Sequence, residues 1–155
     1  MITFENNTFK LDTRNTSYVF CITPFGHLEH IYYGAKLPAA DAEALRLKHT
    51  IPFGSTVAYS KQDNGYCLDT MLLEYSGIGK GDYRQTPIEC LMPDGTFVSD
   101  FVYDHHRIMK ISYSSNSGLP TAHGQGETLA IFLKDKKCSK LGLVLRYTVF
   151  AECDT

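Results

Sequence analysis

The sequence predicts an all-β fold, an antiparallel β-sandwich (supersandwich) with one or two short helices. Three observations lead to this fold class. Short runs rich in β-branched and aromatic residues recur along the 155 residues, turn residues separate these runs, and a single segment has the composition of a helix. Since strands and helices do not alternate, a parallel sheet with crossover helices is disfavoured. The length suits one domain with its own core, so we expect residues 1–155 to form a single domain.

The first four strands are expected in two consecutive pairs. "ITFE" and "FKLD" are short alternating runs on either side of a turn at Asn6 and Asn7. "TSYVFCIT" is rich in β-branched and aromatic residues, and "PFG" connects it to "HLEHIYYG" as a hairpin. The helix candidate follows at residues 38–49, where "PAADAEALRLKH" has Pro and Asp early and then Ala, Glu and Leu.

Five further strand-like runs are expected in the rest of the chain: "LDTMLLEY", "PIECLM", "FVSDFVYDHHRIMKISY", "ETLAIFLK" and "LGLVLRYTVFAE". A tight turn at "PDG" separates the second run from the third. Residues 112–126 are expected to form a loop, and "KDKKCSK" at 134–140 a solvated hairpin tip. The last strand stops close to residue 155, which suggests that the chain is cut from a longer polypeptide.

The composition argues against several kinds of partner. The formal net charge is -2 with acids and bases interleaved, so we expect no nucleic-acid partner. No apolar stretch approaches the roughly 18–20 residues of a membrane span, and the chain starts without a signal peptide, so we expect no membrane partner. The five cysteines are spread singly, as in a cytoplasmic protein with free thiols, and Cys21 and Cys90 are expected in the core.

The glycine cluster "GIGKGD" is the first candidate for chemistry. A phosphate-binding loop needs a Ser or Thr after its Lys and then a helix, whereas Lys80 is followed by Gly81, Asp82 and a strand-like run. No helix N-terminus is therefore expected here to hold an anion. We expect the glycines to allow a turn through backbone conformations that other residues rarely adopt.

The histidines form no metal-binding pattern. His105 and His106 are neighbours and would point to opposite faces of a strand. His27 and His30 would also lie on opposite faces if their segment is extended. We therefore expect solvent-exposed or cross-strand histidines and no metal site.

The carboxylates leave a hydrolytic site open but undefined. Asp100 and Asp104 would share a face of a regular strand, and three more acids lie near the glycine cluster: Asp69, Glu74 and Asp82. Glycoside hydrolysis needs two carboxyl groups about 5–10 Å apart. The sequence does not define such a separation, and solvated acids are far commoner.

Aromatic residues are the richest class, with ten Tyr, nine Phe and no Trp. "HIYYGAKL" and "YSKQDNGY" place tyrosines beside turns. Such rings can stack on sugars, or they can fill the core or an interface with the hydroxyl at the rim. The core or interface role is favoured.

Several long segments resemble a known family: "NTSYVFCITPFGHLEHIYYGAKL", "LDTMLLEYSGIGKGDYRQTPIE", "DGTFVSDFVYDHHRIMK", "LPTAHGQGETLAIFLKD" and "LRYTVFAECDT". In order and spacing they resemble the N-terminal domain of the α-galactosidases (melibiases) of glycoside hydrolase family 36, over nearly the whole chain. The most specific pieces are "GHLEHIYYG", "LDTMLLEYSGIGKGDYR" and "GLP" followed by "ETL".

The resemblance implies that a (β/α)8 catalytic barrel and a C-terminal β-domain follow this domain in a longer enzyme. The barrel carries the nucleophile and the acid/base for retaining hydrolysis of α-galactosides such as melibiose and raffinose. None of the family's catalytic motifs occurs in this chain, so we expect no catalytic residue and no cofactor here. The implied partners are the barrel of the same polypeptide and the other subunits of a homotetramer.

In tetrameric members of the family, a long loop of this domain reaches the active site of a neighbouring subunit. The matching loop here is residues 48–67, in which Tyr59, Lys61, Asp63 and Asn64 are expected to contact the substrate. The glycine cluster then serves packing and interface geometry. Two alternatives stay open: a free-standing carbohydrate-binding sandwich, and a hydrolase that uses local carboxylates.

Overall fold

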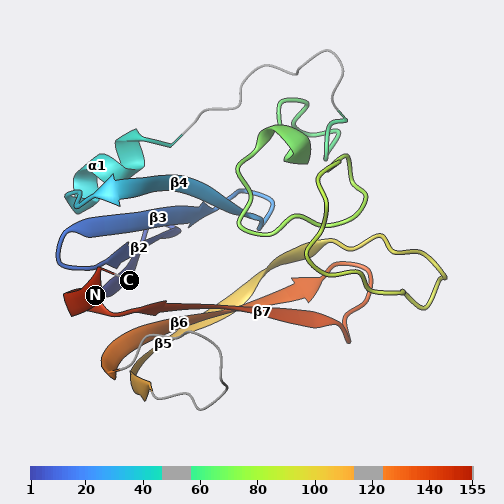
Figure 1. The fold of residues 1–155 in the computed structure, drawn as a ribbon. Helices are drawn as coiled ribbons and strands as arrows, with labels where there is room; N and C mark the ends of the chain where they lie inside the picture. The colour runs from blue at the N-terminus through green and yellow to red at the C-terminus, as the bar shows by residue number, and fades with distance from the viewer. Residues whose placement is uncertain (47–56, 114–123, 155) are drawn as a thin grey trace.

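Two antiparallel sheets stack as layers in the computed structural model, which describes residues 1–46, 57–113 and 124–154 (Figure 1). The first sheet has four strands and the second has three, and short helical segments complete the described chain. The predicted all-β sandwich is therefore confirmed. Both ends of the chain lie at one end of the sandwich, and residues 57–100 cover the other end (Figure 1).

The first sheet forms in chain order from β1 (Ile2–Glu5), β2 (Thr8–Asp12), β3 (Thr16–Ile22) and β4 (Leu28–Ala35). The turn between β1 and β2 lies at the predicted Asn6 and Asn7, whose φ angles are 48° and 59°. Two consecutive positive φ angles are typical of the turn whose twist matches a two-residue hairpin. All four expected strands are confirmed within a few residues of their predicted ends.

The second sheet has the order β5 (Phe101–Tyr113), β6 (Gly124–Asp135) and β7 (Gly142–Val149). An irregularity between Tyr103 and His105 leaves Asp104 outside the regular pairing with β6. Such a bulge shifts the alternation of side chains. Asp100, which precedes the strand, is buried, whereas Asp104 is exposed, so the prediction that they share a strand face is wrong.

Apolar side chains from both sheets meet between the layers. Phe9 and Phe20 from the first sheet and Leu129 and Ile131 from the second are fully buried. The rings of Phe9 and Phe20 stack with centroids 5.1 Å apart. Burying each such side chain contributes roughly 1.5–3 kcal/mol, so this core holds the two layers together.

Two predicted strands are wrong. "LDTMLLEY" contains the 3-10 helix η1 (Leu68–Thr70) and pairs with β4 only through one isolated bridge, Glu29 with Leu73. "PIECLM" contributes to no strand. Leu68 and Met71 of the first run are buried beside the sandwich, where they form a second small cluster with Tyr66, whereas Leu72 of the same run is 56% exposed. Their hydrophobicity reflects this burial and not a strand.

The ends of other elements also differ from the prediction. The helix α1 (Ala39–Ala44) confirms the helix candidate, whose last residues, 47–49, lie outside the described chain. It lies on the outer side of the first sheet (Figure 1). After β7 the chain forms a second 3-10 helix, η2 (Ala151–Cys153), where the prediction continued the strand. The expected loop at 112–126 falls mostly on undescribed residues, and β6 already begins at Gly124.

The surface predictions can be checked at three places. The lysines of the predicted hairpin tip between β6 and β7 are exposed, which confirms it. Cys21 is buried as predicted, whereas Cys90 is only half-buried and lies in no strand, so its expected core position is wrong. Across the described parts of the chain, no helix combines the length and the apolar character needed to cross a membrane.

Candidate functional site

The described part of the predicted substrate loop, residues 57–67, folds into a narrow turn. The Tyr59 amide donates to the Tyr66 carbonyl at 2.8 Å, and an isolated bridge joins Ser60 to Asp63. The Asp63 carboxylate accepts from the Gly65 amide at 2.9 Å. These bonds hold residues 60–64 as a compact tip, which we call the loop tip, whereas residues 48–56 of the loop lie outside the described chain.

The four predicted substrate residues separate into two groups. Lys61, Asp63 and Asn64 are exposed together at the loop tip. Tyr59 is half-buried at the base, where its hydroxyl donates to Asp100 Oδ2 at 2.9 Å and accepts from Lys136 Nζ at 2.6 Å. Lys61, Asp63 and Asn64 therefore face solvent, with one Asp63 oxygen bonded within the tip, whereas Tyr59 holds the base of the loop.

The base of the loop is held by a buried histidine. His27 Nε2 lies 3.1 Å from Asp100 Oδ1, and His27 Nδ1 lies 2.8 Å from the Tyr66 hydroxyl. A carboxylate can only accept, so Nε2 carries the proton and Nδ1 accepts from Tyr66. The Tyr66 oxygen also lies 2.5 Å from Thr23 Oγ1, which leaves the threonine as its donor. The prediction of exposed or cross-strand histidines is wrong for His27, which is buried.

We call these linked side chains the anchor network: Thr23, His27, Tyr59, Tyr66, Asp100 and Lys136. Burial by itself would raise the pKa of Asp100, but hydrogen bonds from His27 and Tyr59 outweigh burial and hold that pKa below its ordinary value. Burial also raises the pKa of both Tyr59 and Tyr66, so both hydroxyls stay protonated. At the centre of the network, the Asp100 carboxylate therefore accepts hydrogen bonds from His27 and Tyr59.

The anchor network connects the loop to both sheets. His27 directly precedes β4, and the Asp100 amide donates to Asp135 Oδ2 at 2.7 Å, at the end of β6. The Lys136 amide in turn donates a hydrogen bond to the Asp100 carbonyl at 3.0 Å. The loop tip therefore projects from a rigid base at the end of the sandwich away from the chain ends (Figure 1).

The sequence analysis missed this network. His27 and Asp100 are 73 residues apart. Both lie in segments that resemble the family, but no local spacing links the two side chains. The one local signal was a histidine directly after the "PFG" turn, which the strand pattern placed near a strand end. Only the packing of residues 57–100 against the end of the sandwich brings the two side chains together.

The glycine cluster forms a tight turn, as predicted. Gly79, Lys80 and Gly81 have φ angles of 88°, 59° and 81°. Its last residue, Asp82, is clamped by Arg84, with 2.9 Å between Nε and Oδ1. The Arg84 guanidinium also donates to the carbonyls of Met71 and Leu68 at 2.6 and 2.7 Å. This arrangement stabilises the loops around the turn and presents no anion site.

The remaining carboxylates and histidines are also in structural contacts. Buried Glu74 accepts from two tyrosines, and Asp104 pairs with Lys134 at 2.8 Å. His105 stacks on Phe132, whereas His106 packs edge-on against Phe9 in the core. The two neighbours thus lie on opposite faces, as predicted. Among the described residues, no three His, Cys, Asp or Glu side chains are grouped to hold a metal ion.

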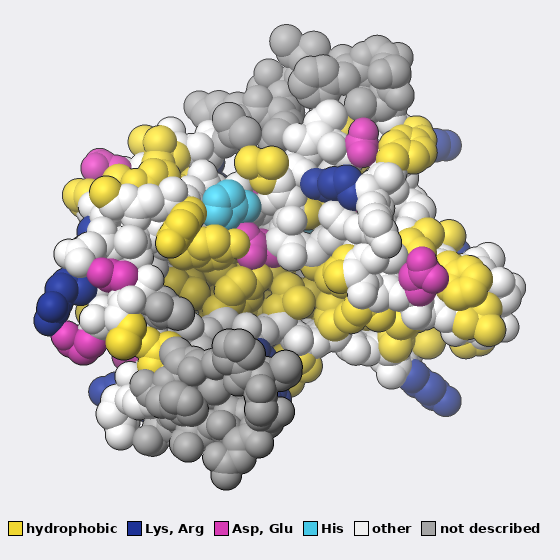
Figure 2. All heavy atoms as spheres, viewed as in Figure 1, with side chains coloured by type: hydrophobic (Ala, Val, Ile, Leu, Met, Phe, Trp, Pro, Cys, Tyr) yellow, Lys and Arg dark blue, Asp and Glu magenta, His cyan; other side chains and the backbone are white. Residues whose placement is uncertain are grey.

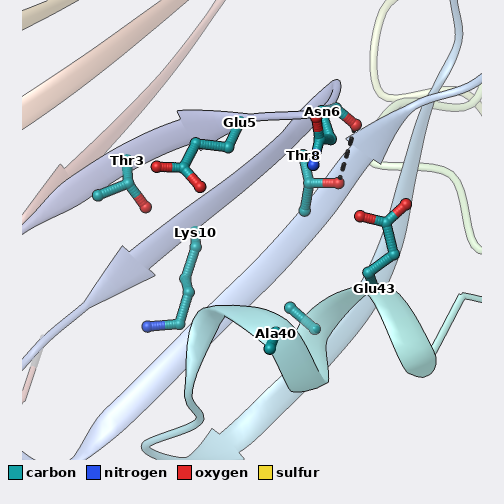
Figure 3. A pocket seen from close by; sticks show the side chains of 8 residues that line it. Thr3, Glu5, Asn6, Thr8, Lys10, Ala40 and Glu43 are labelled. Carbon is teal, nitrogen blue, oxygen red and sulfur yellow. Dashed lines mark hydrogen bonds between the residues drawn. The ribbon is translucent and has the colours of Figure 1, made fainter.

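An open groove of about 470 Å³ runs between the first sheet and α1 (Figure 3). Glu5 on β1 and Glu43 on α1 stand on opposite sides of it, and Lys10 extends from β2 between the walls (Figure 3). The Lys10 amine is engaged by the carboxylate of Asp12. The lysine is already paired and the two glutamates stand on opposite walls, so the residues that line the groove form no catalytic arrangement.

Comparison with known proteins gives consistent matches. The profile of the "Glycosyl hydrolase family 36 N-terminal domain" matches residues 26–155. Among curated proteins, the chain is 29% identical over 150 residues to the α-galactosidase AgaA of Geobacillus stearothermophilus, covering 94% of the chain and 20% of that protein. It is 30% identical over 149 residues to the bifunctional α-galactosidase/sucrose kinase AgaSK of Mediterraneibacter gnavus, covering 94% of the chain and 16% of that protein.

Solved structures agree with the fold. The α-galactosidase AgaB of Geobacillus stearothermophilus superposes with a TM-score of 0.83 at 27% identity, over 98% of this chain and 21% of that one. A doubly substituted AgaA in complex with raffinose gives a TM-score of 0.80 at 29% identity, over 94% of this chain and 20% of that one. The chain spans about a fifth of the length of these relatives.

Proposed function

The chain belongs to the glycosyl hydrolase family 36 N-terminal domains, and from this membership we propose that residues 1–155 form the non-catalytic N-terminal domain of a longer α-galactosidase. The observation that carries the proposal is the match to an N-terminal domain together with its extent: the relatives are α-galactosidases, and the chain covers only 16–21% of their length. The activity, retaining hydrolysis of terminal α-galactosides, belongs to a barrel domain elsewhere in that polypeptide.

The proposed partners are the barrel of the same polypeptide and further subunits of a homotetramer. Exposed apolar side chains in the irregular segment support a role in contacts, since Tyr83, Leu91 and Phe97 are 72%, 69% and 46% exposed. Three large apolar side chains exposed within one segment make that segment the candidate surface for a partner, since apolar patches mark such surfaces. A cytoplasmic location is part of the proposal and is supported by cysteines that form no disulfide.

The loop tip is the proposed point of contact with the substrate of a neighbouring subunit. Lys61, Asp63 and Asn64 offer a donor, an acceptor and an amide to sugar hydroxyls, and all three are exposed. Tyr59 contributes from the base, where it fixes the loop through Asp100. A rigid base reduces the entropy lost when the tip orders against a ligand.

The first test is to sequence the coding DNA beyond the codon for Thr155. We expect the reading frame to continue for several hundred residues into a barrel domain with two catalytic carboxylates. A stop codon directly after Thr155 would contradict the proposal. The chain would then be a free-standing carbohydrate-binding module, the alternative that its sandwich fold and tyrosines allow.

The second test addresses the loop tip in the longer enzyme. Replacing Asp63→Ala should raise KM or lower kcat for raffinose several-fold, because a buried sugar hydroxyl would lose its acceptor. Asp41→Ala, at an exposed aspartate of α1, is the matched control and should leave both constants unchanged. If Asp63→Ala and the control have equal kinetic constants, the loop tip does not contact the substrate. The family assignment does not depend on this result.

A further inference from the structure

A second pocket lies between the layers near the chain ends, at the opposite end of β4 from the anchor network. Hydrophobic side chains gather in the hollow between the two layers (Figure 2). The cavity has a volume of about 310 Å³ and lies between β3, β4 and β7. We call it the tyrosine pocket, after its main lining residues: Tyr18, Tyr33, Tyr147, Thr13, Thr16 and Asp154.

Two of the three tyrosine rings are fixed from behind by one buried carboxylate. Glu74, whose side chain is 5% exposed, accepts from the hydroxyls of Tyr18 and Tyr147, each at 2.7 Å. The Tyr147 ring also stacks on Phe20 in the core, with centroids 5.0 Å apart. Burial, reinforced by the charge of Glu74, raises the pKa of both tyrosines, so both remain protonated donors. Their rings thus form rigid walls before any ligand arrives.

The third ring is open to solvent. Tyr33 is 64% exposed, and its ring centroid lies 6.0 Å from that of Tyr18. The exposed face of Tyr33, beside the fixed ring of Tyr18, therefore offers a flat apolar surface of about the size of one sugar ring. Because Tyr33 lies on the surface, its ring contributes little to the core.

A carboxylate stands at the polar side of the pocket. Asp154 accepts from Thr13 Oγ1 at 2.6 Å, the Asn15 amide at 2.9 Å and Asn15 Nδ2 at 2.7 Å. An ionised carboxylate has about four acceptor sites, so roughly one remains for a ligand hydroxyl. Thr13 and Thr16, whose hydroxyl oxygens are 2.6 Å apart, add polar atoms beside it.

We propose that the tyrosine pocket binds a neutral hexopyranose. One face of a pyranose ring is a set of C–H groups that stacks on an aromatic ring, and its edge carries hydroxyl donors for Asp154. The Asp154 carboxylate disfavours anionic ligands, and hydrogen bonds from Thr13 and Asn15 hold its pKa below the ordinary value, so it stays an acceptor. The volume lies at the lower end of small-molecule sites, which suits a single sugar ring.

The site is separate from the loop tip. His27 and Tyr33 lie near opposite ends of β4, which puts about 20 Å between the two regions at about 3.3 Å per residue. The proposal needs neither a barrel domain nor the parent activity. Its test can therefore fail or succeed independently of the proposed function.

The experiment titrates the chain with D-galactose and D-glucose and follows its amide resonances by NMR. We expect saturable binding in the millimolar range, with shifts confined to the pocket. Tyr33→Ala should weaken binding at least tenfold, and Tyr33→Phe, which keeps the ring, should stay within about twofold of the wild type. Tyr83→Ala removes a tyrosine of comparable exposure, 72% against 64% for Tyr33, from another part of the surface and should leave sugar binding unchanged.

Three outcomes would overturn the inference. The first is the absence of saturable shifts with either sugar. The second is equal binding by Tyr33→Ala and the wild type. The third is an identical response to mannitol, an open-chain polyol without a ring face, since this would reveal a general polyol effect.

Discussion

The paired strands of the two sheets and the segment that covers their end, residues 57–100, are stabilised in different ways. In the sheets, backbone ladders satisfy the main chain and side chains such as Phe9 and Phe20 supply apolar burial. In residues 57–100, no regular strand forms, and charged side chains reach the backbone directly, as Arg84 does at Leu68 and Met71. In this segment, hydrogen bonds from polar side chains satisfy backbone groups that strand pairing satisfies in the sheets.

This difference separates the two regions experimentally. Cavities should weaken the sheets at every pH, because apolar contacts carry no charge. Loss of a charged group should weaken residues 57–100, and part of that effect should depend on pH. The predictions below use this contrast, starting from the largest expected effect.

Phe20→Ala removes a fully buried ring from the centre of the first sheet. The free energy of unfolding should fall by about 3–5 kcal/mol, through lost burial and the cavity left behind. Urea denaturation measures the loss, which should be the same at pH 5 and at pH 7. A loss that varies strongly between these two values would show that charged groups also hold this part of the core.

Arg84→Met removes the guanidinium that clamps Asp82, whose side chain is only 1% exposed. We expect a loss of about 2–3 kcal/mol, because a buried carboxylate and two carbonyls lose their donor. Adding Asp82→Asn should recover part of the loss, since the uncompensated charge is then gone. If the double variant is less stable than Arg84→Met alone, the clamp does not act through this charge pair.

The two regions also differ in how well the sequence predicted them. Alternation placed all seven strands of the sheets, because each has a partner strand and one face on the core. The run "LDTMLLEY" has a similar pattern, but its Leu68 and Met71 pack on Tyr66 beside the sandwich and not on a sheet. A pattern shows that residues are buried, and it does not reveal which surface buries them.

The same limit applies to the candidate sites. The loop residues Lys61, Asp63 and Asn64 could be named because the family resemblance points to the loop that contains them, and their substrate role stays a prediction. The anchor network and the tyrosine pocket combine residues from distant segments, such as Tyr18 with Glu74 and Tyr147. Their partners are set by the stacking of the layers, which no local spacing encodes.

Asp100→Asn tests the anchor network through pH. The pKa of Asp100 is lowered in the folded state, so its contribution to stability is present above the ordinary aspartate pKa of about 3.9 and is lost as pH falls through the folded value. The variant should lose about 1–2 kcal/mol at pH 7 and show a smaller further loss below pH 4 than the wild type. Urea denaturation between pH 7 and pH 3 measures both losses. If the stabilities of the variant and the wild type change in parallel with pH, the charge of Asp100 does not stabilise the network.

Two glycines give the smallest effect and a matched pair. Gly79 and Gly95 both have φ near 80–90°, but a Cβ at Gly79 would lie 2.9 Å from Val98 Cγ1, whereas one at Gly95 meets nothing within 4 Å. Gly95→Ala should cost about 1 kcal/mol through its φ angle alone. Gly79→Ala should lower the free energy of unfolding by about 1 kcal/mol more than Gly95→Ala does, as measured by urea denaturation. Equal losses in the two variants would show that Val98 moves away from the new methyl group at no cost.

The most direct measurement compares α-galactosidase activity in the isolated chain and in the product of the whole reading frame, on one chromogenic α-galactoside. We predict hydrolysis by the longer product and none above background by residues 1–155, because we propose that the active site lies in another domain of that product. Turnover by the isolated chain would contradict the account, since the catalytic carboxylates would then have to lie within these two sheets and the segment that covers them.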